Sequence, residues 1–300
     1  MTVALYDTFL AILGAKGILR GDDIHAGYHT DPRGAADVRP DIVLRPATTQ
    51  EMSQIMAACH EASQPVVVQG GLTGLVVGAM PQHGEVVISL ERMNKVEAVD
   101  PKAGTITVQA GTPLQVVQEA ADAVGMVYPV DLGSRGSCTI GGNLSTNAGG
   151  NRVVRYGMTR DLTLGIEAVL ADGTIINSLN GFIKNNTGYD LKQMFIGSEG
   201  TLGLITRATL RLYPKPKTQV VAFCAADSFD AVTDFMTHMR AGLGADLSAF
   251  EVIWAKTYAA ILSDVPGTKA PVPQGHAFYV LVEMMGSDMA SDTEKFENCL

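Results

Sequence analysis

The hydrophobic positions of this chain follow two spacings, one typical of strands and one typical of helices. Short runs rich in Val and Ile, each bounded by Gly, Pro or Asp, predict strands. Apolar residues three or four positions apart, such as Met52, Ile55 and Cys59, predict a helix with one buried face. This helix follows Thr48-x-x-Glu51, which is the pattern of a capping box.

The predicted elements mix strands and helices without an internal repeat. Strands are expected at residues 41–45, 66–68, 86–90, 95–99, 105–110, 165–170, 174–177, 204–213, 219–224, 249–254 and 278–284. Helices are expected within residues 1–17, after Thr48, at 112–125 and after Ser228, and residues 298–300 are expected to lie inside a further helix. For the helix at 112–125, Thr112 is the expected N-cap and Pro113 the first helical residue. Ala-Asp-Gly at 171–173 predicts a tight hairpin turn.

A proline-rich linker at residues 214–217 is expected to divide the chain. We predict a helical arm and polar loop over residues 1–40, a first domain over 41–217 and a second over 218–300. The pattern after the linker is typical of the opening of an open α+β sheet domain. Roughly 80 residues are few for such a domain, so we expect it to be incomplete at residue 300.

The composition is that of a folded protein, because 46% of the 300 residues are hydrophobic and 18% are charged. A formal net charge of −9 argues against nonspecific binding to nucleic acid or to an anionic membrane, since clustered Lys and Arg would supply that affinity. Residues 62–84 carry no Asp, Glu, Lys or Arg. Their two prolines and five glycines would leave backbone polar groups unsatisfied in lipid, so no transmembrane segment is expected.

Cysteine and histidine positions give little sign of a metal site. The four cysteines lie far apart, with no C-x-x-C pair: Cys59, Cys138, Cys224 and Cys299. Neither a structural zinc site nor a disulfide framework is expected, and a reducing cytoplasm fits this pattern. The N-terminus lacks the basic region of a signal peptide. Near it lie Asp22, Asp23, His25 and His29, for which a solvated loop is favoured over a metal site.

Glycine is over-represented, at 32 residues of 300, and gathers in two patches. The first, Gln69-Gly-Gly-Leu-Thr-Gly-Leu-Val-Val-Gly-Ala79, directly follows a predicted buried strand. It matches neither G-x-G-x-x-G nor G-K-[ST], so dinucleotide-fold and P-loop geometry do not apply. Its glycines could gather N–H groups into an anion-binding nest that a large ligand touches directly. A tight structural turn explains the same glycines equally well.

The second patch covers residues 129–150, and no charged residue occurs from Gly136 through Asn151. Its hydroxyl and amide side chains suit a ligand that is partly aromatic and partly hydrogen-bonding. Arg152, Arg155 and Arg160 follow. They either add positive potential to this site or form surface salt bridges, which is the commoner role of an arginine.

Three motifs in register carry a family resemblance: QGGLTGLVVGA, PVDLGSRGSCTIGGNLSTNAGGNRVVRYG and KNNTGYDLKQMFIGSEGTLGLITRATLRLYPKP. From about residue 41 to 217 the chain resembles the FAD-binding domain of the vanillyl-alcohol-oxidase (PCMH) type. It is most similar to FAD-dependent D-2-hydroxyacid dehydrogenases, which include D-2-hydroxyglutarate and D-lactate dehydrogenases and the glycolate oxidase flavoprotein subunit. The resemblance implies an α+β fold, in which a two-subdomain FAD-binding domain precedes the start of an α+β substrate domain.

The resemblance also implies which residues bind FAD. The loop around the pyrophosphate would be Gln69, Gly70, Gly71, Leu72, Thr73, Gly74 and Leu75. The flavin and phosphates would be lined by Pro129, Leu132, Gly133, Ser137, Gly141, Gly142, Asn143, Thr146, Asn147, Ala148 and Gly149, and the adenine side by Glu199, Gly200, Gly203 and Ile205. Members that bond FAD covalently through the first loop carry histidine where this chain has Leu72. Leucine has no nucleophile, so noncovalent FAD is expected.

In this family a hydride moves from the α-carbon of a 2-hydroxy acid to flavin N5, while a base removes the hydroxyl proton. The resemblance implies a quinone or an electron-transfer flavoprotein as acceptor, and it is compatible with a homodimer and with a location at the periphery of a membrane. The base, the carboxylate clamp and the histidine ligands of a divalent metal such as zinc are expected after residue 300. The catalytic residues are therefore unknown, and no metal ligand is assigned here.

A few other residues are weaker candidates. His238 and His276 lie beyond the linker without metal-ligand spacing. Lys184 could reach an anionic substrate, although an exposed loop lysine is favoured. Tyr189 could stack on a ligand or be half-buried.

Three functions stay open from the sequence. The first is a dehydrogenase of D-2-hydroxy acids such as D-2-hydroxyglutarate, D-lactate or glycolate. The second is a flavin-binding or electron-transfer subunit without its own substrate site. The third is an NADPH-dependent reductase of a sugar nucleotide on the same fold. Bleaching of the flavin by NADPH would favour the third.

Overall fold

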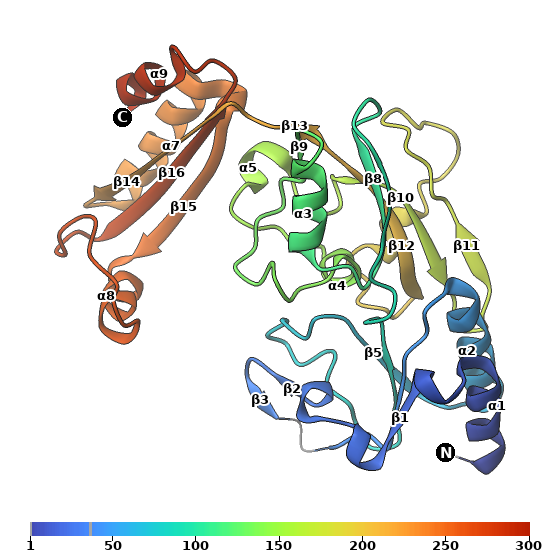
Figure 1. The fold of residues 1–300 in the computed structure, drawn as a ribbon. Coiled ribbons are helices and arrows are strands. Elements are labelled where there is room, and N and C mark those ends of the chain that lie inside the picture. The colour runs from blue at the N-terminus through green and yellow to red at the C-terminus, as the bar shows by residue number, and fades with distance from the viewer. Residues whose placement is uncertain (1, 36–37) are drawn as a thin grey trace. The chain divides into compact units, whose positions relative to one another are not determined.

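The chain forms two compact units in the computed structural model, which describes residues 2–35 and 38–300 (Figure 1). The first unit comprises Met1–Tyr128, Gly133–Ala148 and Thr159–Pro214. The second comprises Pro129–Leu132, Gly149–Met158 and Lys215–Leu300. The second unit therefore includes two short pieces of the second glycine patch. Residues 36–37, within the polar loop expected before residue 40, lie outside the described residues.

The first sheet of the first unit is mainly parallel. Its strands, in the order β1-β4-β6-β5, are β1 (Ile18–Arg20), β4 (Ile42–Leu44), β6 (Val86–Ser89) and β5 (Val66–Gln69). Strands β4 and β5 both run parallel to β6, and β1 is antiparallel to β4. Helices α1 (Val3–Leu13) and α2 (Thr49–Glu61) pack on each other and on this sheet.

The start of α2 is held by the expected cap. The hydroxyl of Thr48 accepts a hydrogen bond from the Glu51 N–H at 3.1 Å. The return bond goes one residue further back than in the usual capping box, from the Ala47 N–H to Glu51 Oε2 at 2.6 Å. Two donors that the helix itself cannot satisfy are thus paired.

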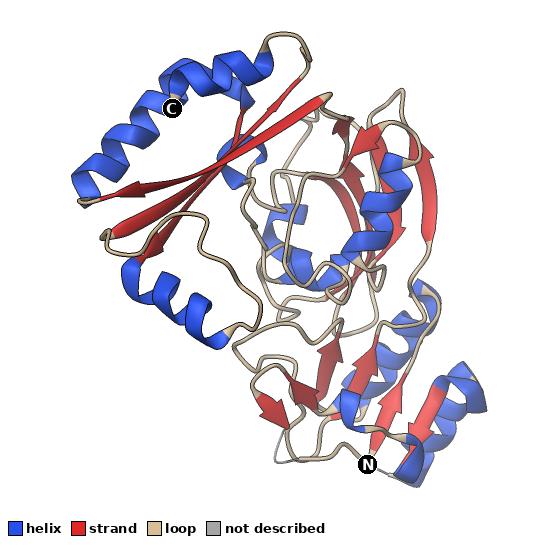
Figure 2. Cartoon of the chain, turned by 60° about the vertical axis from the view of Figure 1, so that its left-hand side comes forward, coloured by secondary structure: helices blue, strands red, loops and turns tan. Residues whose placement is uncertain are grey.

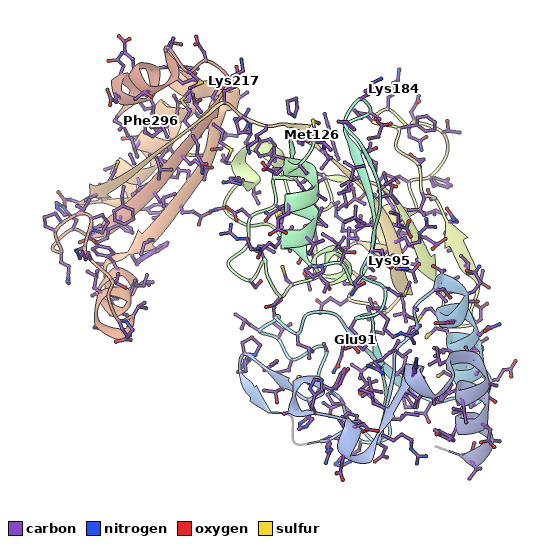
Figure 3. The ribbon with its side chains drawn as sticks, in the orientation of Figure 1. Glu91, Lys95, Met126, Lys184, Lys217 and Phe296 are labelled. Carbon is purple, nitrogen blue, oxygen red and sulfur yellow. The ribbon has the colours of Figure 1, made fainter. Side chains whose placement is uncertain are left out.

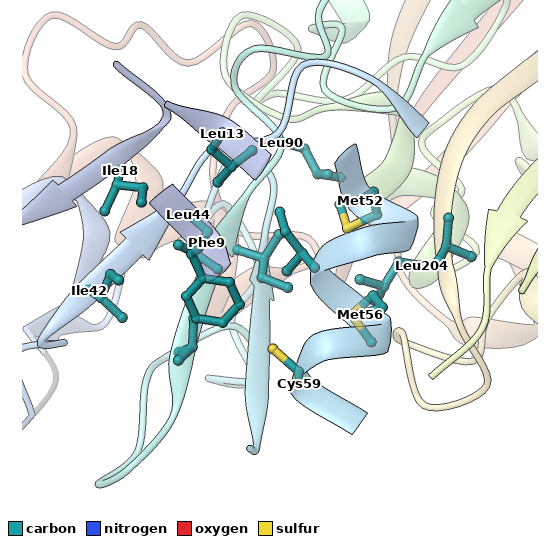
Figure 4. Packing of buried hydrophobic residues seen from close by; sticks show 14 of the residues in the cluster. Phe9, Leu13, Ile18, Ile42, Leu44, Met52, Met56, Cys59, Leu90 and Leu204 are labelled. Atoms are coloured by element: carbon teal, nitrogen blue, oxygen red, sulfur yellow. The ribbon is translucent and has the colours of Figure 1, made fainter. Parts of the chain in front are cut away.

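The core of this sheet joins the first residues of the chain to α2. Phe9, Ile42, Met52 and Ile55 are at most 1% exposed and belong to one apolar cluster (Figure 4). Because α1 supplies part of this cluster and β1 pairs with β4, the beginning of the chain is part of the first unit rather than a separate arm. Burial of such side chains stabilises the unit by about 1.5–3 kcal/mol each.

The second sheet of the first unit is antiparallel. Its strands, in the order β11-β10-β12-β8-β7, are β11 (Ile175–Asn177), β10 (Thr163–Val169), β12 (Leu204–Arg211), β8 (Thr105–Gln109) and β7 (Val96–Asp100). The predicted hairpin between β10 and β11 is confirmed, and its turn bonds Leu170 N–H to Thr174 O at 2.9 Å. Gly173 takes φ +86° in this turn, a conformation that glycine adopts without steric cost.

One predicted cap is wrong. Helix α3 (Leu114–Asp122) has Pro113 as its N-cap, not Thr112, and no side chain caps it. Its first N–H groups are satisfied instead by loop carbonyls, Leu114 N–H by Cys138 O at 3.0 Å and Gln115 N–H by Arg135 O at 2.9 Å. The Thr112 hydroxyl donates to the carbonyl of Lys95. A tertiary contact has replaced the local cap.

The remaining elements of the first unit are short. They are η1 (Ala15–Gly17), η2 (Gly21–Asp23), η3 (Ala26–Tyr28), β2 (Thr30–Asp31), β3 (Gly34–Ala35), β9 (Met126–Val127), α4 (Ile140–Ser145), α6 (Lys192–Phe195) and β13 (Tyr213–Pro214). Strands β9 and β13 pair with each other, as do β2 and β3. None of the helices in the described residues is long and apolar enough to cross a bilayer.

The second unit is built on one antiparallel sheet. Its strands, in the order β14-β16-β15, are β14 (Thr218–Ala226), β16 (Phe278–Gly286) and β15 (Leu247–Trp254). The unit also contains α5 (Val153–Tyr156), α7 (Phe229–Leu243), η4 (Gly244–Asp246), α8 (Ala255–Asp264) and α9 (Asp292–Cys299). Helices α7 and α9 run along one face of the sheet (Figure 2). Their apolar residues, including Met239 and Phe296, form the core with Val282 and Met284 of β16.

Candidate functional site

The first glycine loop, residues 69–75, lies directly against residues 137–139 of the second glycine loop, which spans residues 129–150. A Cβ atom on Gly71 would lie 1.9 Å from the carbonyl oxygen of Ser137, and one on Gly70 would lie 2.4 Å from the hydroxyl of Thr139. Real Cβ contacts are not this short, so only glycine fits at either position. The two patches, far apart in the sequence, therefore meet backbone to backbone within the first unit.

Gln69 fixes the beginning of the first glycine loop. Its side chain is 1% exposed, and Nε2 donates to Tyr28 O at 2.8 Å and to Ala79 O at 2.9 Å. The start of the loop is thereby bonded to Ala79, the last residue of the first glycine patch. Leu72 takes φ +52°, a left-handed conformation that a leucine adopts only when its surroundings impose it. Gly74 faces open space, because no atom lies within 4 Å of its Cβ position.

Beside this loop the structure contains a cleft of about 440 Å³. It is lined by His25, Gly27, Tyr28, Thr30, Asp31, Pro32, Gln69, Gly70, Gly71, Leu72, Thr73, Ser89, Glu91 and Ser137. Tyr28 OH donates to Glu91 Oε2 at 2.8 Å, and Arg45 Nη1 lies 2.9 Å from Glu91 Oε1. Burial and then the bond to Glu91 raise the pKa of Tyr28 to about 12, so the phenol stays protonated (Glu91 is labelled in Figure 3).

The sequence did not point to this wall of the cleft. His25 was expected in a solvated loop, and Tyr28 and Glu91 carry no local signal of a site. Tyr28 reaches the glycine loop through its carbonyl, 41 residues away from Gln69. A contact over such a separation has no periodicity that would reveal it.

The second glycine loop folds around the short helix α4. The Thr139 hydroxyl caps this helix by accepting from Gly142 N–H at 3.4 Å. Gly141 packs against the end of β8, since its Cβ would lie 2.8 Å from Ala110 Cβ. Gly142, by contrast, has no neighbour closer than 3.4 Å to its Cβ position, and nothing lies within 4 Å of that of Gly133. Gly142 and Gly133 therefore leave room for a ligand.

The third sequence motif, residues 184–216, contacts α4 through two backbone hydrogen bonds. Gly197 N–H donates to Leu144 O at 2.9 Å, and Glu199 N–H to Ser145 O at 3.0 Å. The Glu199 carboxylate lies 3.3 Å from the Cβ position of Gly78, just beyond the first loop. Asn147 and Glu199 both take left-handed φ values, +48° and +52°. Strained backbone of this kind gathers at binding sites more often than elsewhere.

The other expected FAD residues are distributed as follows. Thr146, Ala148 and Gly200 lie in the first unit near α4, while Gly203 and Ile205 are packed at the start of β12. Ser137 is exposed at the cleft, and Asn143 is buried in α4. Pro129, Leu132 and Gly149 belong to the second unit.

The three arginines after the second loop do not form a positive patch on it. Arg160 donates to the Gln193 carbonyl and to that of Ile196 within the first unit. Arg152 and Arg155 are bound to partners in the second unit. All three guanidinium groups are therefore held by the fold. Arg152 forms ion pairs, as one of the two expectations had it, although these pairs are largely buried. Arg155 and Arg160 instead donate to backbone carbonyls.

The loops fit FAD by the chemistry of their free groups. Of the five buried side-chain polar atoms without a hydrogen-bond partner among the described residues, four lie in or next to these loops: Gln69 Oε1, the Tyr128 hydroxyl oxygen, Asn143 Nδ2 and Asn151 Oδ1. Such atoms are rare in folded proteins and call for a partner. Uncharged donors and acceptors, with open glycines between them, suit a cofactor that carries ring carbonyls, ring nitrogens and phosphates.

The remaining candidates come from other segments of the chain. Lys184 and Tyr189 are both in an exposed stretch, and Tyr189 is 96% exposed (Lys184 is labelled in Figure 3). His276 Nδ1 pairs with Asp227 at 2.8 Å in the second unit. Within residues 2–35 and 38–300, no group of three His, Cys, Asp or Glu side chains could hold a metal ion.

Two family models match the chain. Residues 40–178 match an FAD binding domain, and residues 215–300 match the C-terminal domain of FAD linked oxidases. Solved structures share the fold over the whole chain: an alkyldihydroxyacetonephosphate synthase (TM-score 0.81, 18% identity, 59% of that chain) and p-cresol methylhydroxylase with substrate bound (TM-score 0.75, 20% identity, 63% of that chain). The chain thus contains an FAD binding domain followed by the C-terminal domain of FAD linked oxidases, in agreement with the predicted FAD-binding fold.

Curated relatives indicate a more specific family. The chain is 46% identical to the mitochondrial D-2-hydroxyglutarate dehydrogenase of Bos taurus over 85% of its length, and 39% identical to that of Arabidopsis thaliana over 96%. It is 40% identical to the D-2-hydroxyglutarate dehydrogenase of Xanthomonas citri over 87%. The chain belongs to the family of FAD-dependent D-2-hydroxyacid dehydrogenases. It spans about half the length of these relatives, 46%, 52% and 55% respectively.

Proposed function

We propose that this protein oxidises a D-2-hydroxy acid to the corresponding 2-oxo acid, with FAD as the oxidant. The observation that carries the proposal is the 39–46% identity to proteins named D-2-hydroxyglutarate dehydrogenase, which extends over most of the chain. Among the possible acids, D-2-hydroxyglutarate is the substrate we propose, because all three of these relatives carry it in their names.

In this proposal the two glycine loops hold FAD. Backbone N–H groups at residues 70–74 bind the pyrophosphate, since glycines there let several donors converge. The free Nδ2 of Asn143 and the residues around Gly142 line the flavin and the phosphates, and the turn at Glu199 and Gly200 binds the adenine side. FAD, when bound, supplies a two-electron acceptor for a hydride. The protein binds FAD in a fixed orientation and excludes water from it.

The proton chemistry is assigned to the part of the relatives that this chain does not span. A hydroxyl proton must leave as the carbon is oxidised, and a positioned base does this. We propose that the base, the groups that grip the substrate carboxylates and any divalent metal come from that part. His276 and His238 are assigned no role in the reaction.

The proposed electron acceptor is a quinone or an electron-transfer flavoprotein. Its support is the absence of a G-x-G-x-x-G nicotinamide motif from the sequence. The four cysteines are free thiols, which supports a reducing compartment such as the cytoplasm. The relatives from Bos taurus and Arabidopsis thaliana are named mitochondrial, so cell fractionation should compare these compartments. A homodimer is proposed as well, and light scattering tests it.

The activity is tested by anaerobic mixing of the full-length protein with D-2-hydroxyglutarate. The flavin absorbance should bleach with the D-enantiomer and stay oxidised with the L-enantiomer. Bleaching by NADPH alone, without response to any 2-hydroxy acid, would replace the dehydrogenase by the reductase of a sugar nucleotide. FAD binding without reduction by either compound would favour the electron-transfer subunit.

A further inference from the structure

Residues 149–158, which we name the anchored segment, pack on the sheet of the second unit. Arg152 makes two hydrogen bonds to one carboxylate of this sheet, from Nε to Glu283 Oε1 at 3.1 Å and from Nη2 to Glu283 Oε2 at 3.3 Å. Such a fork geometry fixes the guanidinium plane as well as its position. The Arg152 side chain is 14% exposed and that of Glu283 only 8%.

The Glu283 carboxylate accepts hydrogen bonds from two further side chains of the same sheet. It lies in the middle strand β16, where Ser248 Oγ donates to Oε1 at 2.7 Å and Gln219 Nε2 donates to Oε2. Burial raises the pKa of Glu283, but the hydrogen bonds from Arg152, Ser248 and Gln219 and the charge of Arg152 outweigh it and lower the pKa overall. The carboxylate is therefore ionised and fully hydrogen-bonded at neutral pH.

Further contacts hold the same segment. Arg155 Nη1 donates to the carbonyl of Met285, also in β16, and Val154 packs against the apolar core of the second unit. Arg152 Nη2 lies 3.5 Å from Asp131 Oδ2. Gly150, at φ +97°, touches Asp131 closely, because a Cβ there would lie 2.2 Å from the Asp131 carbonyl oxygen. The anchored segment is thus joined both to the sheet and to residues 129–132.

We infer that the Arg152–Glu283 pair is a positioning device for FAD binding, which sets the conformation of residues 129–132 and 149–151 by tying them to β16. The inference rests on the proposed FAD site, because Pro129, Leu132 and Gly149 are among the expected FAD residues. Glu283, a residue of the second unit, thus affects FAD affinity through Arg152. Neither side chain needs to touch FAD.

The burial of the pair gives the expected size of the effect. Loss of one member of a buried, hydrogen-bonded ion pair leaves the other charge without its partner, which is more costly than removing both. The anchored segment would then rearrange to return the charge to water. We expect FAD affinity to fall by about tenfold or more, the effect of roughly 1.4 kcal/mol.

The test uses the full-length protein, freed of FAD and titrated with FAD while the quenching of flavin fluorescence is followed. Glu283→Gln and Arg152→Gln should each weaken FAD binding about tenfold or more, and Arg152→Lys less than Arg152→Gln. The double variant should lose less than the sum of the two, since the residues act as a pair. Lys295→Gln is the matched control, because it breaks another ion pair of the second unit, with Asp246 at 2.8 Å.

Hydrogen exchange supplies a readout that a general loss of stability would not give. In the FAD-free Glu283→Gln protein, amides of the anchored segment should exchange faster, while those of β4 and β6 stay unchanged. The inference is wrong if both single variants bind FAD with wild-type affinity. It is also wrong if their loss of affinity only follows the fall in thermal midpoint, as in Lys295→Gln. Should Glu283→Gln not fold, the two Arg152 variants decide. Failure of the wild-type protein to bind FAD would instead refute the proposed function.

Discussion

Alanine at Gly71 should damage the contact between the two glycine loops. The added Cβ would lie 1.9 Å from Ser137 O, 2.7 Å from Ser137 C and 2.9 Å from Cys138 Cα. These are backbone atoms, which cannot rotate away as a side chain can. The N–H groups of Ser137 and Cys138 both bond to Ser134 O at 2.8 Å, and Cys138 O accepts from Leu114 N–H at 3.0 Å. A displaced loop would strain these bonds.

The magnitude follows from this geometry. An ordinary contact begins at 3.4 Å, so one loop must move by about 1.5 Å. Overpacking costs about 1–3 kcal/mol, and rigid backbone on both sides places Gly71→Ala near the upper value of about 3 kcal/mol. For a unit of about 200 residues, each kcal/mol lowers the thermal midpoint by about 2–4 °C. We therefore expect a midpoint about 6–12 °C lower, measured by far-UV circular dichroism on FAD-free protein.

Gly74→Ala is the control, because it lies in the same loop and no atom is within 4 Å of its Cβ position. Its thermal midpoint in the FAD-free state should equal that of the wild-type protein. If Gly71→Ala also unfolds at the wild-type midpoint, the close approach of the loops is wrong. If both variants are equally destabilised, the loss does not come from the contact with Ser137.

Three further predictions concern the cofactor and acid stability. FAD should be released intact when the protein is denatured, because Leu72 has no nucleophile; flavin that stays with the precipitated chain would contradict this. Gly142→Asp should abolish FAD retention with little change in far-UV circular dichroism, since it adds a negative charge near the expected phosphates; a yellow variant with normal flavin content would remove Gly142 from the site. The folded-state pKa of Glu283 is lowered, so its contribution to the free energy of unfolding is present above the ordinary glutamate pKa of about 4.3 and is lost as the pH falls through the lower folded-state value. The destabilisation caused by Glu283→Gln, measured by urea unfolding, should therefore shrink below about pH 4, and a constant difference would refute the ion-pair assignment.

The sequence by itself determined the local structure. Alternating Val and Ile residues gave most strands within one or two residues. Thr48 caps its helix as predicted, and the helix expected after Ser228 begins there. The hairpin turn at Gly173 was likewise readable. These features depend on bonds between residues a few positions apart, so their signals are periodic and short. The long motifs around the two glycine patches also identified the family before any geometry was known.

Only the tertiary structure decided which distant groups meet. It brought Gly71 against Ser137, formed a cleft wall from Tyr28 and Glu91, and placed Arg152 on Glu283, 131 residues further along the chain. It also replaced the expected Thr112 cap by loop carbonyls. Contacts of this kind depend on closing long loops, whose entropic cost rises only slowly with length, so sequence separation does not select the partner. The partner is selected by which surfaces remain free to pack once the sheets and helices have formed.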